Sequence, residues 1–274
     1  MGNHNLSVIL LIFLAVSLII FIILGLNNQL TMTYYQVVDS KVEEDFEVLL
    51  ITDLHSNRFG EDQQEILSKI EEASPDIVLL SGDIIDDRLP MEVGFQTVKH
   101  IAKSYPTYYV TGNHEIASKQ VEFIEKKLSS FGIKLLAGKR DEMIVNGQTI
   151  SLMGLDDPNV YADYWQQIED LEHYDSEQLT FLLAHRPERI KDYQRLDVDY
   201  VFSGHAHGGQ WRIPYILENG LMAPGQGLFP KYTQGIYDLK RFKLIVSRGL
   251  SREIPNVPRF YNPPELVVIE FKKS

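Results

Sequence analysis

Five short clusters of acidic, amide and histidine residues constrain the fold of this chain, because each one adjoins a run of β-type residues. The clusters are Asp53-Leu54-His55, Gly82-Asp83-Ile84-Ile85-Asp86, Gly112-Asn113-His114-Glu115, Ala184-His185 and Gly204-His205-Ala206-His207. The adjoining runs are residues 47–52, 77–81, 108–111, 179–184 and 198–203. Five strand ends are therefore expected to carry all of the candidate chemistry.

The segments between several of these runs have helical periodicity. Apolar residues recur at spacings of three and four over residues 62–73, 91–104 and 119–131. Strands that alternate with helices imply crossover connections and largely parallel pairing. In such folds ligands collect at the carboxyl ends of the strands, which is where the five clusters stand.

The middle and the end of the chain have a different pattern. Residues 142–154 contain Asn146-Gly147 between two β-type runs, which is the strongest short signal for a hairpin. Residues 244–247 and 266–271 are predicted to be further strands. The sequence therefore predicts an α/β protein with mixed sheets, partly antiparallel and flanked by helices.

Residues 8–26 contain no charged side chain. At about 1.5 Å per residue, a helix of this length matches a hydrocarbon core of roughly 30 Å. We expect an uncleaved transmembrane anchor here, preceded by a short tail of residues 1–7. A cleaved secretory signal is the first alternative, but it would show Lys or Arg before the apolar run and small residues at a cleavage site, and neither is present. A buried helix of a soluble protein is the second alternative.

The residues after this stretch bear on topology. Basic residues tend to stay on the cytoplasmic side of a membrane, and the nearest one here is Lys41. This absence permits translocation of the large C-terminal part, so we expect a single-pass membrane protein with an extracytoplasmic catalytic domain. Residues 27–45 are expected to be a linker or an edge strand, with residues 34–38 favouring the strand.

The acidic balance of the chain limits its partners. A net charge of −12, from 38 acidic and 26 basic residues, argues against nucleic acid, because a phosphate polymer would be repelled. The C-terminal part nevertheless carries a locally basic segment, which is either a solvated face or a phosphate-binding one. Its members are Lys231, Lys240, Arg241, Lys243, Arg248, Arg252 and Arg259. Because the chain has no cysteine, any metal must be held by oxygen and imidazole.

The donors in the five clusters suffice for two divalent ions. Mn, Fe, Co and Zn accept mixed carboxylate, amide and imidazole ligands, and two ions about 3.5–4 Å apart can clamp both reacting oxygens at phosphorus. Asp83 is the obvious bridging ligand, since it follows an apolar strand and then a glycine. Asp53 and His55 occupy alternate positions of an extended segment, and His205 and His207 repeat that spacing. Each cluster alone is a weak signal, but five in one chain, each at a strand end, favour a functional site.

The order Asp-x-His, Gly-Asp-x-x-Asp, Gly-Asn-His-Asp/Glu, His, Gly-His-x-His resembles the calcineurin-like metallophosphoesterase superfamily, from about Glu47 to the C-terminus. This resemblance implies a four-layer α/β/β/α sandwich over residues 46–274. It implies a first metal site of Asp53, His55, Asp83 and His207, and a second of Asp83, Asn113, His185 and His205. It also implies that His114 binds the phosphoryl oxygens and protonates the leaving group, while Asp86 orients its imidazole. Glu115 stands where many members have Asp, and it is not implied to be a ligand.

Further motifs in the C-terminal part narrow the resemblance. Residues 204–211 read Gly-His-Ala-His-Gly-Gly-Gln-Trp, and residues 231–235, 246–250 and 263–266 add Lys-Tyr-Thr-Gln-Gly, Val-Ser-Arg-Gly-Leu and Pro-Pro-Glu-Leu. Together they resemble the membrane-anchored bacterial branch of YkuE-like and YaeI-like phosphodiesterases and of the UDP-2,3-diacylglucosamine pyrophosphatase type. Candidate substrate-binding residues for a phosphorylated lipid head group are Lys231, Arg248 and Arg252. Structural salt bridges would explain these three residues equally well.

The resemblance implies a hydrolase that cleaves a phosphodiester or pyrophosphate bond by attack of a metal-bridging hydroxide. The expected substrate is a membrane-associated glycolipid precursor such as UDP-2,3-diacylglucosamine, and no nucleic acid is expected. Two divalent ions are the expected cofactors, with Mn favoured over Fe, Zn, Co or Ni. A broad phosphomonoesterase and an inactive membrane-tethered scaffold are the alternative functions.

Overall fold

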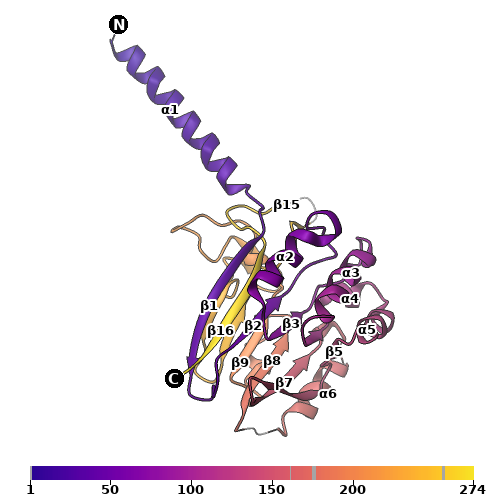
Figure 1. The fold of residues 1–274 in the computed structure, drawn as a ribbon. Coiled ribbons are helices and arrows are strands. Elements are labelled where there is room, and N and C mark those ends of the chain that lie inside the picture. The colour runs from indigo at the N-terminus through magenta and orange to yellow at the C-terminus, as the bar shows by residue number, and fades with distance from the viewer. Residues whose placement is uncertain (1, 161, 175–176, 255–256) are drawn as a thin grey trace.

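The computed structural model describes residues 2–160, 162–174, 177–254 and 257–274 (Figure 1). Its helices begin with the long α1 (Gly2–Gly25), which projects from the remainder of the chain. The other helices are η1 (Glu61–Gln63), α2 (Gln64–Ala73), α3 (Met91–Ala102), α4 (Asn113–Ala117), α5 (Val121–Ser129), η2 (Pro158–Val160), α6 (Ala162–Leu171), α7 (Ile190–Tyr193) and η3 (His207–Gly209).

Two six-stranded sheets carry most of the strands. The first sheet has the order β1-β16-β2-β3-β4-β5 and the second has the order β12-β13-β9-β8-β7-β6. Strands of the first sheet are β1 (Thr31–Asp39), β2 (Phe46–Ile51), β3 (Ile77–Ser81), β4 (Thr107–Val110), β5 (Lys134–Leu135) and β16 (Glu265–Lys273). Strands of the second sheet are β6 (Arg140–Val145), β7 (Gln148–Leu155), β8 (Leu179–Ala184), β9 (Tyr200–Ser203), β12 (Gly235–Asp238) and β13 (Lys243–Val246). Two small hairpins, β10 (Met222–Ala223) with β11 (Gly227–Leu228) and β14 (Glu253–Ile254) with β15 (Val257–Pro258), lie outside the sheets.

Both sheets are mixed, as the sequence predicts. Strands β2, β3, β4 and β5 are parallel, whereas β16 joins β2 antiparallel. In the second sheet β7, β8, β9 and β13 are parallel, and antiparallel strands β6 and β12 form its two edges. The parallel strands bring their carboxyl ends to one edge of each sheet.

Alternation along the central strands builds the layers. Val48 and Leu50 of β2 join an apolar cluster with side chains of β8 and β9, which lies between the two sheets. Leu49 and Ile51 point the other way, into a second cluster with α2, α3 and α5. A third cluster joins the outer face of the second sheet to α6 and α7. The result is the four-layer α/β/β/α arrangement that the resemblance implies, with continuous apolar strands because both faces are buried.

Local backbone geometry explains where elements depart from the prediction. Helix α2 begins at Gln64 rather than at residue 62, because Asp62 and Gln63 are left-handed with φ of 47° and 64°. The hairpin is confirmed: β6 and β7 pair antiparallel, and Asn146 and Gly147 have φ of 47° and 88°, as a two-residue turn of this kind requires.

Helix α1 is long and apolar enough to cross a membrane. Residues 5–25 have a mean hydropathy of 3.4 in their most apolar window, and only 6% of that window is buried. A signal sequence near the N-terminus would have the same properties. Strand β1 follows the helix and forms the outer edge of the first sheet, paired in parallel with β16.

Candidate metal centre

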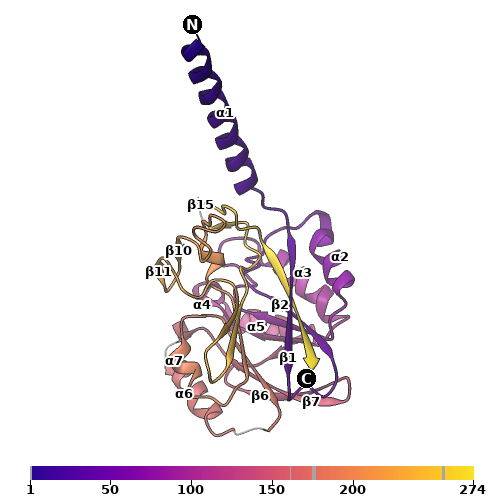
Figure 2. The same cartoon turned by 90° about the vertical axis from the view of Figure 1, so that its left-hand side faces the viewer.

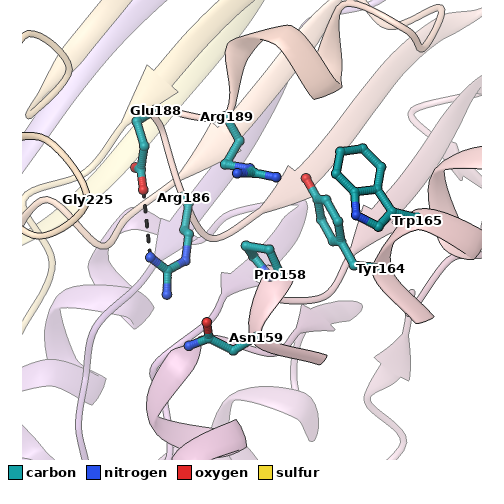
Figure 3. Close-up of a pocket in the computed structure, with 8 residues that line it drawn as sticks. All are labelled: Pro158, Asn159, Tyr164, Trp165, Arg186, Glu188, Arg189 and Gly225. Atoms are coloured by element: carbon teal, nitrogen blue, oxygen red, sulfur yellow. Dashed lines mark ion pairs between the residues drawn. The ribbon is translucent and has the colours of Figure 1, made fainter. Parts of the chain in front are cut away.

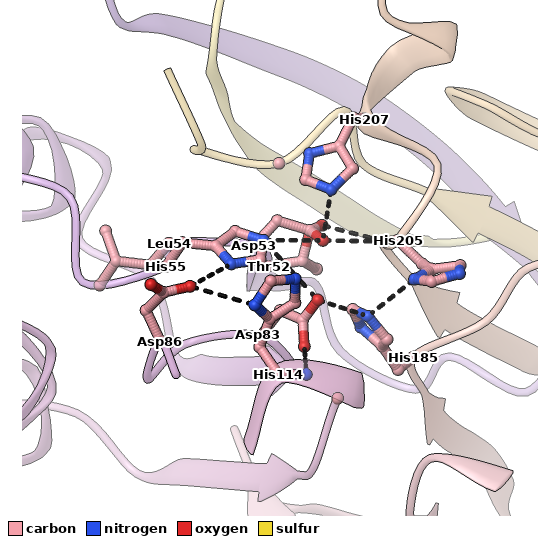
Figure 4. A network of polar contacts seen from close by, with 12 residues as sticks. Thr52, Asp53, Leu54, His55, Asp83, Asp86, His114, His185, His205 and His207 are labelled. Carbon is pink, nitrogen blue, oxygen red and sulfur yellow. Dashed lines mark hydrogen bonds and ion pairs between the residues drawn. The ribbon is translucent and has the colours of Figure 1, made fainter. Parts of the chain in front are cut away.

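The five polar clusters meet where the carboxyl ends of the two sheets face each other (Figure 4). Backbone hydrogen bonds extend the ladders past the strand ends: Asp53 N donates to Gly82 O at 3.1 Å, and Gly204 N donates to His185 O at 3.0 Å. Direct contacts also cross between the sheets: His185 Nδ1 lies 2.8 Å from Ser81 O, and Ser81 Oγ donates to Phe202 O at 2.8 Å. Strand pairing therefore gathers residues that are far apart in the sequence.

Six of the seven predicted ligands form two groups. Asp53, His55 and His207 form the first group, in which the Asp53 Oδ1 atom lies 3.9 Å from His55 Nε2 and 3.7 Å from His207 Nε2. Asp83, His185 and His205 form the second, with 3.1 Å between Asp83 Oδ2 and His185 Nε2. The same Asp83 oxygen lies 3.6 Å from His55 Nε2, so it faces both groups as a bridging ligand would.

Two buried polar atoms support metal binding at this site. His55 Nε2 and Asn113 Oδ1 have no hydrogen-bond partner within the described part of the chain. Buried polar atoms are nearly always paired, so orphaned atoms in a cluster of donors indicate a missing partner. Carboxylate, carboxamide and imidazole donors suit Mn, Fe and Zn. The residues present therefore fit two divalent ions.

The charges around the centre also favour cations. Burial by itself lowers the pKa of His185, but the Asp83 carboxylate raises it to about 10. Burial and the neighbouring charge of His185 instead lower the pKa of His205, and burial and His55 lower that of His207. The pKa of Asp53 is raised by burial. The Asp83 carboxylate thus attracts positive charge, whereas burial and neighbouring imidazoles hold the pKa values of His205 and His207 below their usual range.

The backbone at the centre is unusual. Five of the seven predicted ligands have a left-handed φ, which is uncommon outside glycine. These are Asp53 (51°), His55 (46°), Asp83 (52°), His205 (64°) and His207 (46°). Such conformations cost about 1–3 kcal/mol each and concentrate at functional sites, where the surroundings enforce them.

Two motif glycines are required by close approach. A Cβ at Gly112 would lie 2.2 Å from Asp83 Oδ1, and one at Gly204 would lie 2.4 Å from Asp53 Oδ2. Both distances are below van der Waals contact. The glycines of Gly-Asn-His-Glu and Gly-His-x-His therefore let these loops pass directly over the two carboxylates.

Glu115 organises the loop that carries Asp83. Its buried carboxylate accepts hydrogen bonds from four backbone N–H groups, those of Asp83 (2.9 Å), Ile84 (2.7 Å), Ile85 (2.9 Å) and Gly112 (2.9 Å). Glu115 is not among the predicted ligands, and its four hydrogen bonds give it a positioning role. Its place in the tetrapeptide Gly112-Asn113-His114-Glu115 is the only sign of this role in the sequence.

His114 lies beside the ligands and reaches the cavity above them. Its Nδ1 atom lies 2.6 Å from Asp87 Oδ1 and 3.1 Å from Asp86 Oδ1. Asp86 Oδ1 is also 3.1 Å from His55 Nδ1. Burial lowers the pKa of His114, but the hydrogen bond to Asp86 and the nearby Asp83 charge raise it to about 9. Asp87, the closer of the two partners, was missed by sequence reasoning although it directly follows Asp86.

A cavity of about 280 Å³ opens over the centre. Its walls include five of the predicted ligands, Asp86 and His114, together with residues that the sequence analysis did not single out. These additional residues are Asn57, Arg88, Leu89, Pro224 and Ser251. The exposed Arg88 guanidinium supplies a positive charge at the mouth, with its Nε 3.7 Å from Asp87 Oδ2.

The three predicted substrate-binding cations do not line this cavity. Arg248 is paired with the buried carboxylate of Glu265 at 2.6 Å. Arg252 is paired with Glu65 at 2.9 Å. The Lys231 ammonium lies 5.0 Å from the centre of the Tyr232 ring. Both arginines thus make the salt bridges that formed the alternative explanation.

A second cavity of about 630 Å³ adjoins the centre (Figure 3). Arg186 lines this cavity and contacts the centre: it is paired with Asp157 at 2.6 Å, and its Nη1 atom lies 3.2 Å from His205 Nε2. On the far wall the Arg189 guanidinium lies 5.5 Å from the ring centre of Tyr164. This cavity brings cationic and aromatic side chains close to the second ligand group.

Comparison with known proteins gives one family. The model of the calcineurin-like phosphoesterase family matches residues 46–209, which is more than half of the chain. An uncharacterised metallophosphoesterase of Campylobacter jejuni is 29% identical over 90% of this chain and 66% of its own length. YkuE of Bacillus subtilis, named as an uncharacterised metallophosphoesterase, is 25% identical over 84% of this chain and 80% of its own. The phosphodiesterase YaeI of Escherichia coli is 27% identical over 75% of each chain. The chain belongs to the calcineurin-like phosphoesterase family.

Proposed function

We propose that the chain hydrolyses phosphodiester or pyrophosphate bonds with two divalent ions, Mn being favoured. Asp53, His55, Asp83 and His207 would hold the first ion, and Asp83, Asn113, His185 and His205 the second. The observation that carries the proposal is the position of Asp83 Oδ2, within 3.6 Å of His55 Nε2 and 3.1 Å of His185 Nε2. The orphaned atoms of His55 and Asn113 support the same ligand set.

When bound, the ions supply positive charge for the phosphoryl oxygens and lower the pKa of water. The side chains perform the remaining tasks. His114 keeps its Nδ1 proton directed at Asp86 and Asp87, which leaves Nε2 for the substrate. Its Nε2–H group binds a phosphoryl oxygen and then donates its proton to the leaving oxygen. No side chain is required to form a covalent bond to phosphorus.

The substrate that we propose is a membrane-associated glycolipid precursor such as UDP-2,3-diacylglucosamine. Three features support this class: the apolar helix α1, the apolar side chains of Leu89 and Pro224 in the cavity wall, and the similarity to a protein named phosphodiesterase. We further propose that α1 is a single membrane span and that the catalytic domain is extracytoplasmic. Lys231, Arg248 and Arg252 remain proposed contacts for the head group.

The full chain in detergent with Mn²⁺ and bis-p-nitrophenyl phosphate tests the activity. We expect release of nitrophenol that disappears on chelation and falls strongly in His114→Ala. Faster turnover of p-nitrophenyl phosphate than of the diester would instead support the phosphomonoesterase. Absence of turnover with every phosphate ester tried, in a protein that binds Mn²⁺, would support the scaffold.

A further inference from the structure

Large apolar side chains gather on the segment that follows the last ligand. Six of them are exposed, and we call them the apolar rim: Trp211, Tyr215, Ile216, Met222, Leu228 and Phe229. Tyr215 is 95% exposed and Ile216 is 80% exposed. A concentration of this kind on one short segment marks a surface that contacts an apolar partner.

The apolar rim lies at the end of the molecule from which α1 leaves. Figure 2 shows β10 and β11, which carry Met222 and Leu228, at that end, and both views place β15 there as well. Trp211 contacts β15 through a hydrogen bond, because its indole N–H donates to Pro258 O at 2.8 Å. A backbone bridge also joins Trp211 to Phe260.

The same region fastens the end of α1. The Tyr261 hydroxyl donates to Phe21 O at 2.9 Å, and its backbone N–H donates to Gly25 O at 2.6 Å. The Phe21 ring packs on Phe260 with 5.6 Å between ring centres. A Cβ at Gly25 would lie 2.2 Å from the Phe260 ring, so glycine allows this contact. A bilayer entered by α1 would therefore begin beside the apolar rim.

The chemistry of the segment suits a bilayer surface. Residues 211–230 contain only two ionisable side chains that are charged at neutral pH, Arg212 and Glu218, and Arg212 is buried. Lys231 follows directly and is exposed. Trp and Tyr at the boundary, apolar side chains beyond it and a lysine behind it are the arrangement found at membrane interfaces.

We propose that the apolar rim inserts into the interface of the phospholipid bilayer that α1 enters, as a second membrane contact. This second contact rests on the proposed membrane position of α1, but it does not depend on the proposed hydrolase activity. The contact would set the catalytic cavity at the bilayer surface, because Pro224 of the same segment lines that cavity. The segment is also tied to the loop that carries His207, because Leu221 N donates to Gly209 O at 2.8 Å.

Tryptophan fluorescence tests the contact, since the chain has two tryptophans at opposite ends of the molecule. Trp211 belongs to the apolar rim, and Trp165 lies on α6, far from α1 in both views. The full chain is reconstituted in phosphatidylcholine vesicles with or without bromine on the acyl chains. In Trp165→Phe, which keeps Trp211, we expect brominated lipid to quench several times more fluorescence than in Trp211→Phe, which keeps Trp165.

A pair of variants tests the apolar rim itself. In the Trp165→Phe background, Ile216→Asp with Phe229→Asp should reduce the quenching of Trp211 to the level of Trp165. Ile144→Asp, which changes an equally exposed apolar residue on β6, should leave the quenching unchanged. Vesicle flotation with equal quenching of both tryptophans would overturn the rim contact alone. A Trp211 emission maximum that moves to longer wavelength when the protein is diluted in detergent, with no vesicles present, would instead assign the rim to a second copy. Failure of the full chain to float would overturn the membrane position of α1 together with the rim.

Discussion

The two sheets contribute different chemistry to the candidate metal centre. The first sheet supplies both carboxylates, the carboxamide, one imidazole ligand and His114, whereas the second supplies only imidazoles, those of His185, His205 and His207. Their loops are also held differently: a buried carboxylate, Glu115, fixes the first side, and a carboxamide, Asn262, fixes the second. Carboxylate oxygens therefore lie on one side and imidazole nitrogens alone on the other. Divalent ions held by both groups would therefore join the carboxyl ends of the two sheets, beside direct contacts such as that between His185 Nδ1 and Ser81 O.

Asp83→Asn changes the carboxylate that both ions are proposed to share. We expect it to have the largest effect on activity. Outer-shell partners of a metal contribute about 10–100-fold to activity, so loss of a shared ligand should cost more than about 100-fold. Turnover of bis-p-nitrophenyl phosphate with saturating Mn²⁺ measures the effect. Asp141→Asn, which neutralises a carboxylate on β6 paired with Lys134, is the matched control and should retain activity. Equal activity of the two variants would show that the first side needs no shared carboxylate.

Glu115→Gln removes the support of the charged side without touching a ligand. The single carboxamide oxygen of glutamine cannot accept from all four N–H groups, and its NH2 group would face two of these donors, so we expect the free energy of unfolding to fall by about 2–3 kcal/mol. Urea denaturation of the full chain in detergent, with Glu142→Gln as a surface control, measures this value. Glu142 is more than half exposed at its side chain. If the free energy of unfolding changed as little as in the control, Glu115 would not stabilise the loop that carries Asp83.

Asn262→Ala makes the corresponding change on the imidazole side. It removes the donor to the carbonyls of His207 and Gln210, at 2.7 and 3.2 Å. Because His207 is then less firmly placed, we expect about a tenfold higher Mn²⁺ concentration for half-maximal activity. Gln166→Ala, which deletes an exposed amide on α6, should not change it. An unchanged Mn²⁺ requirement in Asn262→Ala would mean that the second side is held by its backbone alone.

Asp87→Asn distinguishes the contributions of the two carboxylates beside His114. We expect it to have the smallest effect on activity. Asp86 still contacts both His114 and His55, so loss of Asp87 should lower kcat by about tenfold or less and leave KM nearly unchanged. Asp86→Asn should lower kcat further, because it loses two imidazole contacts. Steady-state kinetics of both variants give the order, and a larger loss in Asp87→Asn would reverse the roles of the two residues.

Sequence reasoning succeeded where the chemistry sits on regular structure. Each predicted ligand follows a strand with a clear apolar pattern, so the positions of Asp83 and His185 beside each other follow from sheet topology. Glu115 and Asp87 were not predicted because their roles depend on where loops fold back. The left-handed φ values at Asp53 and His205 are likewise imposed by tertiary contacts and leave no trace in residue type.

The apolar rim, in contrast, could not be predicted from the sequence. Residues 211–230 contain glycine, proline and scattered apolar residues with no helical or strand period, so nothing in their spacing separates a core segment from a surface one. Only the fold places Ile216 and Phe229 outside. The basic residues illustrate the same point, since the ion pairs of Arg248 and Arg252 with Glu265 and Glu65 bring together distant parts of the chain.

Metal content tests whether the two sheets share two ions through Asp83. The full chain is loaded with Mn²⁺, freed of excess metal by gel filtration and measured by elemental analysis. We expect two Mn per chain in the wild type, one in His207→Ala, one in His185→Ala and fewer than one in Asp83→Asn. One ion or none in the wild type, or the same content in all four proteins, would contradict a shared two-metal centre.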